Sequence, residues 1–203
     1  PGCTRMRRAM VRPGRDRLSS LVEVDESYVG GEKSGKRGRG AEGKALVAVA
    51  VEDKGDQGIG RIRMAVVPDA SGKSLIGFVC ASVVEGSGVR TDGWSGYSAL
   101  SAAGYDHIVE RRDASVGDRP SKLVHLAVSL LKRWLLGTHQ GAVSHEHLPY
   151  YLDEFVFRFN RRTSTHRGLL FFRLLQNAVV GDPLPYKTIV KSVRGPKPRS
   201  HKI

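Results

Sequence analysis

Cysteine is nearly absent from this chain. Its 203 residues include only Cys3 and Cys80, which lie far apart and form no CxxC pair. A disulfide framework and a cysteine-based zinc ribbon are therefore excluded, and a reducing cytoplasm fits. Long apolar stretches are also missing, since the longest uninterrupted run, residues 45–51, has seven residues. A membrane-spanning helix needs about 20, so we expect no insertion in a membrane.

Acidic residues are few relative to basic ones. The chain has 33 Lys and Arg against 20 Asp and Glu, a formal charge of +13, while 40% of its residues are hydrophobic. It can therefore fold around a core and still carry a strongly positive field, which favours a polyanionic partner such as nucleic acid. Six Arg lie in residues 1–20 and six Lys or Arg in residues 187–203, which suggests basic arms along phosphates or solvated termini.

The length predicts one α/β domain, placed at residues 21–180, between a basic segment 1–20 and a basic, disordered tail 181–203. Residues 21–29 alternate apolar and polar side chains as a strand does, with Glu23, Asp25 and Ser27 on one side. Further strands are predicted at 45–52, 60–67, 89–91 and 105–110. The strands 21–29, 45–52 and 60–67 are predicted to pair as an antiparallel meander. Helices are predicted at 71–85, at 121–136 with Ser121 as N-cap and Gly137 as stop, and at 148–162.

This order of elements makes a mixed five-stranded sheet with helices on both faces, and it resembles the ribonuclease-H-like fold. In such a sheet Asp25, on the first strand, and Asp92, ending the fourth, become neighbours although 67 residues separate them. Clustered carboxylates of that fold hold two Mg²⁺ or Mn²⁺ ions that activate a water or a 3′-hydroxyl and stabilise the leaving oxygen. Carboxylates are suitable hard ligands for these ions.

Four sequence blocks, in order, resemble DDE-type insertion-sequence transposases of the ISXO-like group. They are VEVDESYVGG, TDGWSGY, HLAVSLLKRWLLGTH and HEHLPYYLDEFVFRFNRR. The resemblance covers about residues 5–180, and four ordered blocks are more specific than any single motif. It implies that the chain is a transposase catalytic domain. Residues 1–20 would then be the last part of an N-terminal DNA-binding region.

The resemblance also implies the site. Asp25 and Asp92 are the metal-binding aspartates, His125 is the third member 33 residues after Asp92, and Lys132 is the following basic residue. On a helix, positions 125 and 132 lie about 20° apart, so both point the same way. Taken singly, an Asp-Gly pair such as Asp92-Gly93 is typical of a turn. A single histidine on an apolar helix, such as His125, is more often a core residue than a metal ligand. Their joint spacing favours a site.

Position 125 is more commonly Glu in such transposases. Imidazole is a softer ligand than carboxylate and loses its metal when protonated. We therefore predict relatively better activity with Mn²⁺ than with Mg²⁺ and a fall in activity toward pH 6.

DNA contacts are predicted in three regions. The Gly-rich segment 30–44 either wraps a phosphate backbone or is a solvated hairpin connection. Trp134 is expected to pack in the core, whereas Trp94 is the better candidate for stacking on a base. The predicted DNA-binding residues are Lys33, Lys36, Arg37, Arg39, Arg133, Arg161 and Arg162.

The leading hypothesis is a cytoplasmic, nucleoid-associated transposase that binds transposon ends and target DNA, hydrolyses a phosphodiester and transfers the strand. Chemistry on two ends implies a homo-oligomer on DNA. A degenerate transposase remnant that only binds DNA is the main alternative. A nuclease acting on RNA:DNA hybrids is the third.

Overall fold

The computed structural model of the chain describes residues 2–12, 14–30, 44–110, 121–139, 145–166 and 168–180. The chain divides into two compact units. The core unit is Asp16–Thr163, and the terminal unit combines Pro1–Arg15 with Ser164–Ile203. Every predicted site residue that the structure describes belongs to the core unit.

Five strands form one mixed sheet in the order β3-β2-β1-β4-β5. β1, β2 and β3 pair as the predicted antiparallel meander, whereas β4 and β5 run parallel to β1. The sequence predicts each strand to within one residue at either end. The bounds are β1 (Leu21–Val29), β2 (Ala45–Asp53), β3 (Ile59–Val67), β4 (Gly88–Thr91) and β5 (Asp106–Val109).

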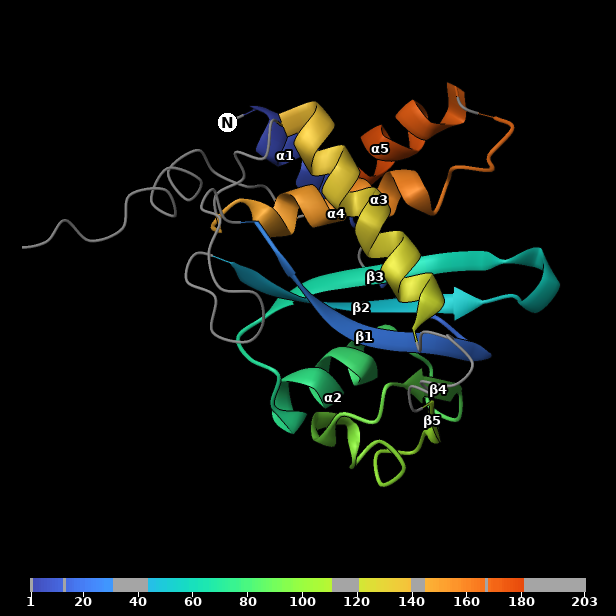
Figure 1. Cartoon of the computed structure of the whole chain (residues 1–203). Coiled ribbons are helices and arrows are strands. Elements are labelled where there is room, and N and C mark those ends of the chain that lie inside the picture. Colours follow the sequence, from blue (N-terminus) through green and yellow to red (C-terminus); the bar gives the residue numbers. More distant parts are fainter. Residues whose placement is uncertain are drawn as a thin grey trace, which may run out of the picture. The chain divides into compact units, whose positions relative to one another are not determined.

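Helices cover both faces of this sheet (Figure 1). α3 (Lys122–His139) and α4 (Leu148–Phe159) pack on one face with Val47, Val49 and Val51 of β2, and α2 (Gly72–Ser82) packs on the other. β2 is buried at all positions but its last, which explains its uninterrupted apolar sequence. The predicted architecture, a mixed five-stranded sheet with helices on both faces, is confirmed. None of the helices in the described ranges is long and apolar enough to cross a membrane.

Three helix ends lie three residues from their predicted places: α2 ends earlier, at Ser82, α4 ends earlier, at Phe159, and α3 ends later. α3 continues through Gly137 to His139, so the predicted stop is wrong. The last turn is held by packing, because the His139 ring lies 5.0 Å from Trp134 and 4.5 Å from Tyr151, centroid to centroid. These contacts outweigh the roughly 1 kcal/mol that a helical glycine costs. Trp134 packs on the core as predicted.

The terminal unit contains two helices that the sequence pattern did not predict, α1 (Gly2–Ala9) and α5 (Gly168–Val180), and they pack against each other. α5 carries a single charged residue, Arg173, in an otherwise largely apolar sequence. Its polar residues Arg173, Gln176 and Asn177 share one face at i, i+3 and i+4 spacing, a helical signal that the sequence interpretation overlooked.

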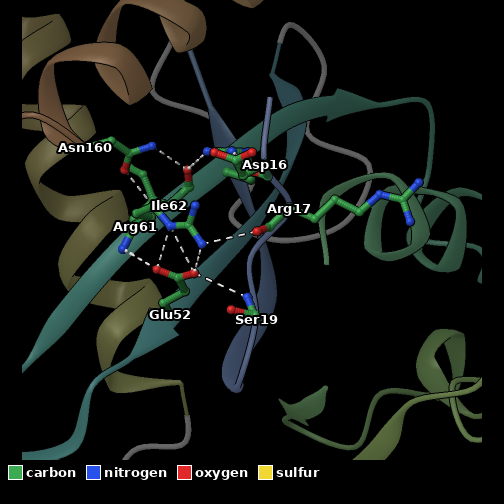
Figure 2. A network of polar contacts seen from close by, with 8 residues as sticks. Asp16, Arg17, Ser19, Glu52, Arg61, Ile62 and Asn160 are labelled. Carbon is green, nitrogen blue, oxygen red and sulfur yellow. Dashed lines mark hydrogen bonds and ion pairs between the residues drawn. The ribbon is translucent and has the colours of Figure 1, made fainter. Parts of the chain in front are cut away.

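The edge strand β3 is hydrogen-bonded by a side chain at the end of α4. Just after that helix, Asn160 Oδ1 accepts from the backbone N–H of Ile62 on β3 at 2.8 Å, and Asn160 Nδ2 donates to the Ile62 carbonyl at 3.1 Å. Nearby, Glu52 accepts hydrogen bonds from Arg61 and from the N–H of Ser19 (Figure 2). The Asn160 side chain thus occupies backbone groups that an edge strand would otherwise expose.

Candidate active site

Asp25 and Asp92 are brought together by the parallel pairing of β1 with β4. The pairing ends with Glu23 beside Arg90; Asp25 lies two residues further along β1, and Asp92 directly follows the last residue of β4. Burial raises the pKa of Asp25 to about 7; the N–H of Glu26, which donates to Asp25 Oδ1 at 2.7 Å, opposes this rise, and the charge of Asp92 adds to it. The structure therefore makes the two aspartates electrostatic neighbours, as the sequence predicts.

The loop that carries Asp92 is shaped by its own sequence. Asp92 Oδ1 accepts from the N–H of Trp94 at 2.9 Å, a local turn bond of the kind Asp favours. Gly93 has φ +82°, and a Cβ there would come within 2.7 Å of Val109 Cγ1. A Cβ at Gly96 would meet the Ala70 carbonyl oxygen at 2.8 Å. Both glycines are required for the loop to sit where it does.

Trp94 fastens this loop to the start of α2. Its indole N–H donates to the Ala70 carbonyl at 3.0 Å, and its ring, half-buried, packs on the core cluster beneath α2. These contacts give Trp94 a structural role in holding the loop. Stacking of Trp94 on a DNA base stays a prediction.

Tyr97, in the short 3-10 helix η2 (Ser95–Tyr97), is a site-supporting residue that the sequence interpretation missed. Its fully buried side chain donates a hydrogen bond to Glu26 Oε2 at 2.9 Å, across 71 residues of sequence. Burial and the Glu26 carboxylate raise the pKa of Tyr97, so the phenol remains a donor. The bond connects the Asp92 loop to the residue next to Asp25. The only sequence signal is the tyrosine that ends TDGWSGY.

The first turn of α3 is capped from the sheet. Glu23 Oε1 on β1 accepts from the N–H of Val124 at 2.7 Å. Ser121, the predicted N-cap, has φ +60°, and its buried hydroxyl meets no partner at hydrogen-bond geometry among the described residues. It lies close enough to Asp25 to lower that residue's pKa a little against the larger rise from burial. The prediction of Ser121 as the cap is therefore wrong.

His125 lies in that first turn with an exposed side chain. Across the described ranges, no three His, Cys, Asp or Glu side chains are grouped closely enough to hold one metal ion, so His125 is not gathered with Asp25 and Asp92 into such a site. The metal-binding roles of Asp25, Asp92 and His125 all stay predictions.

Lys132 lies two turns further along α3, beside β1. Its ammonium is 3.3 Å from Ser27 Oγ, two residues beyond Asp25 on the same face of the strand. Burial, with a contribution from Lys44, lowers the pKa of Lys132. The predicted cation thus stands next to the aspartate strand.

Comparison with known proteins identifies the domain. Residues 17–160 match the model of the ISXO2-like transposase domain family. The chain belongs to this family. Among solved structures, the catalytic core domain of BIV integrase matches over 80% of this chain and 98% of that chain, at 15% identity and a TM-score of 0.46. No curated protein matches the chain by sequence.

The matched range nearly coincides with the core unit, so the transposase domain is that unit. On its surface Arg133 of α3 is exposed. Arg162 donates to the carbonyls of Ile59, Gly60 and Phe159, and Arg161 lies 3.9 Å over the Phe157 ring. These two arginines therefore have intramolecular roles, and their contact with DNA stays a prediction. The other predicted DNA-binding residues, Lys33, Lys36, Arg37 and Arg39, lie outside the described residues.

Proposed function

We propose that this chain is the catalytic domain of a transposase that cuts DNA at insertion-sequence ends and joins the freed 3′-hydroxyl to target DNA. The observation that carries the proposal is the proximity of Asp25, on β1, to Asp92, just past the end of the parallel neighbour β4, where the charge of Asp92 acts on Asp25. Membership of a transposase family supports the reaction class. The charge of +13 suits DNA as the substrate.

The residues present fit two divalent ions in part. Asp25 and Asp92 offer hard oxygen ligands, and the pKa of Asp25, about 7, reflects burial and a like charge that a bound cation would offset. Such ions supply activation of a water or a 3′-hydroxyl and stabilisation of the leaving oxygen. In this proposal His125 approaches the aspartates from the first turn of α3.

The remaining roles belong to side chains around the aspartates. Lys132 positions the DNA backbone beside the site, since its ammonium stands next to β1 on the Asp25 face. Tyr97 and Glu26 hold the Asp92 loop against β1. Reaction at two transposon ends requires at least two such domains, so we expect a homo-oligomer on DNA.

The test is a cleavage and strand-transfer assay on duplexes carrying the element's ends, with Mn²⁺, Mg²⁺ or EDTA. We compare the native chain with Asp25→Ala, Asp92→Ala and His125→Glu. The matched control is Asp56→Ala, which removes an exposed carboxylate in the short 3-10 helix η1 (Gly55–Gln57). Both site alanine variants should lose activity by about a thousandfold or more, and the control should not.

The outcomes separate the rivals. Cleavage in EDTA, or retention of activity by Asp25→Ala, contradicts the proposal. DNA binding that is equal in EDTA and Mn²⁺, without any nicking, identifies a binding remnant. Cutting of RNA:DNA hybrids with transposon ends ignored identifies the hybrid nuclease instead.

A further inference from the structure

Glu23 is the most deeply buried carboxylate of the described residues, with 2% of its surface exposed. It lies on β1 two residues before Asp25 and faces the same side of the sheet. Oε1 accepts from the N–H of Val124 at 2.7 Å. Burial raises the pKa of Glu23, and the N–H groups of Val124 and Leu123 oppose that rise. Arg90 Nη1 stands 3.8 Å from Oε2. A buried charge is tolerated because these groups compensate it.

The contact joins a carboxylate to the positive end of a helix. The first N–H groups of a helix lack partners within it, and an acid there is favoured by the helix dipole. α3 contains no acidic residue in its first turn, and Ser121 does not cap it. Glu23 therefore supplies from the sheet the cap that the helix lacks in its own sequence.

A second contact sets the direction of α3 along β1. Glu23 touches Val124, and Ser27 touches Lys132. Eight helical residues advance about 12 Å. Four strand residues advance about 13 Å. The two spans match, so α3 runs alongside β1 in the same sense, and Asp25 lies between the two contacts.

We propose that Glu23 is a positioning residue for the cutting and joining reaction: by capping α3 from β1, it fixes the first turn of that helix, which carries His125, alongside the strand that carries Asp25. The inference rests on the proposed function. Glu23 acts through the helix and touches neither DNA nor the reacting atoms.

Three variants test this role. Glu23→Ala removes the acceptor, whereas Glu23→Gln keeps an oxygen for the Val124 N–H but loses the charge. Glu52→Ala is the matched control, because Glu52 is also a buried carboxylate of the sheet, at 5% exposure, held by Arg61 and the N–H of Ser19. Ala48, Ala50 and Glu52 are every second residue of β2, so they share the face of the sheet that α2 covers, opposite to the face of Asp25.

Two quantities are measured on folded protein. The first is the Mn²⁺-dependent cleavage rate at saturating DNA, together with the affinity for DNA. We expect Glu23→Ala to lose about 10- to 100-fold in rate with DNA affinity unchanged. Glu23→Gln should stay within roughly threefold of the native rate, because it retains the hydrogen bond.

The second is amide hydrogen exchange at Leu123, Val124 and His125, which needs no catalytic activity. We expect exchange there to accelerate about tenfold or more in Glu23→Ala and to stay native-like in Glu52→Ala. If exchange responds but even the native chain cuts nothing, the proposed function fails while the cap stands.

Three results overturn the positioning role. One is a Glu23→Ala variant that cleaves DNA at the rate of the native chain. Another is a rate loss in Glu52→Ala as large as in Glu23→Ala, which reports general destabilisation. The third is a Glu23→Gln variant as inactive as Glu23→Ala, because the charge itself would then be needed.

Discussion

Replacing Asp25 by Asn should abolish cleavage and at the same time stabilise the metal-free protein. Asn has nearly the same shape, and its Oδ1 still accepts from the N–H of Glu26, which lies 2.7 Å from the native Asp25 oxygen. The substitution removes only the charge, which is half-buried and repelled by Asp92. A site prepared for cations is strained when it holds none.

The magnitude follows from the pKa. Burial, reinforced by Asp92, raises the pKa of Asp25 from 3.8 to about 7. At about 1.4 kcal/mol per unit, ionising Asp25 costs the folded protein up to about 4 kcal/mol. Solvent reaches part of the side chain, so we expect about half of that, about 2 kcal/mol. For a domain of this size the melting temperature would rise by about 4–8 °C.

The sign of the pH dependence is set by the raised pKa. Between pH 4 and pH 7 the folded state binds more protons at Asp25 than the unfolded state does, so the free energy of unfolding decreases as pH rises through this window. The advantage of Asp25→Asn should therefore be small near pH 4 and fully developed by pH 8.

The assay is urea or thermal unfolding in EDTA at several pH values, with Asp56→Asn as the control for an exposed carboxylate. Adding Mn²⁺ should stabilise the native chain and not Asp25→Asn. The reasoning is refuted if Asp25→Asn is no more stable than the native chain at pH 8. It is refuted equally if the gain is the same at pH 4 and pH 8.

Three further predictions follow from the same contacts. Protons compete with metal at Asp25, so the Mn²⁺ concentration for half-maximal cleavage should rise about fivefold between pH 7 and pH 6; a constant requirement would contradict this. Tyr97→Phe removes the donor to Glu26 and should lower the free energy of unfolding by about 1–3 kcal/mol, measured in urea, while Tyr28→Phe should have no effect. Asn160→Ala strips the β3 edge of two hydrogen bonds and should destabilise by about 2 kcal/mol and promote self-association in size-exclusion chromatography; a stable monomer would argue against the edge-protecting role.

Local patterns were sufficient for the strands. β1 is predicted at its observed bounds because apolar residues alternate along it, and β2 because its uninterrupted apolar run is buried on both faces. Asp92 is different, because an Asp-Gly pair after a strand predicts only a turn, and the candidate role of this residue came from the resemblance of TDGWSGY to a transposase block. These signals are carried by residues close together in sequence, so they can be read without knowing the fold.

Contacts across long stretches of sequence were not predictable in this way. An Asn at a helix end commonly bonds to nearby backbone, yet Asn160 pairs with Ile62, 98 residues away. Ser121 was expected to cap α3, but Glu23 does so across 101 residues. In each case the sequence offers a plausible local partner, and packing selects a distant one.

The amino-acid sequence by itself determined where the strands and helices lie along the chain, because periodicity and turn chemistry act over a few residues, and the meeting of Asp25 with Asp92 was expected only through the resemblance to a known family. Only the tertiary structure decided how the rest of the site is held. The cap from Glu23, the bond from Tyr97 to Glu26 and the place of α3 beside β1 depend on which buried polar groups find each other once the chain has closed. Burial makes those partners obligatory, and no local pattern specifies them.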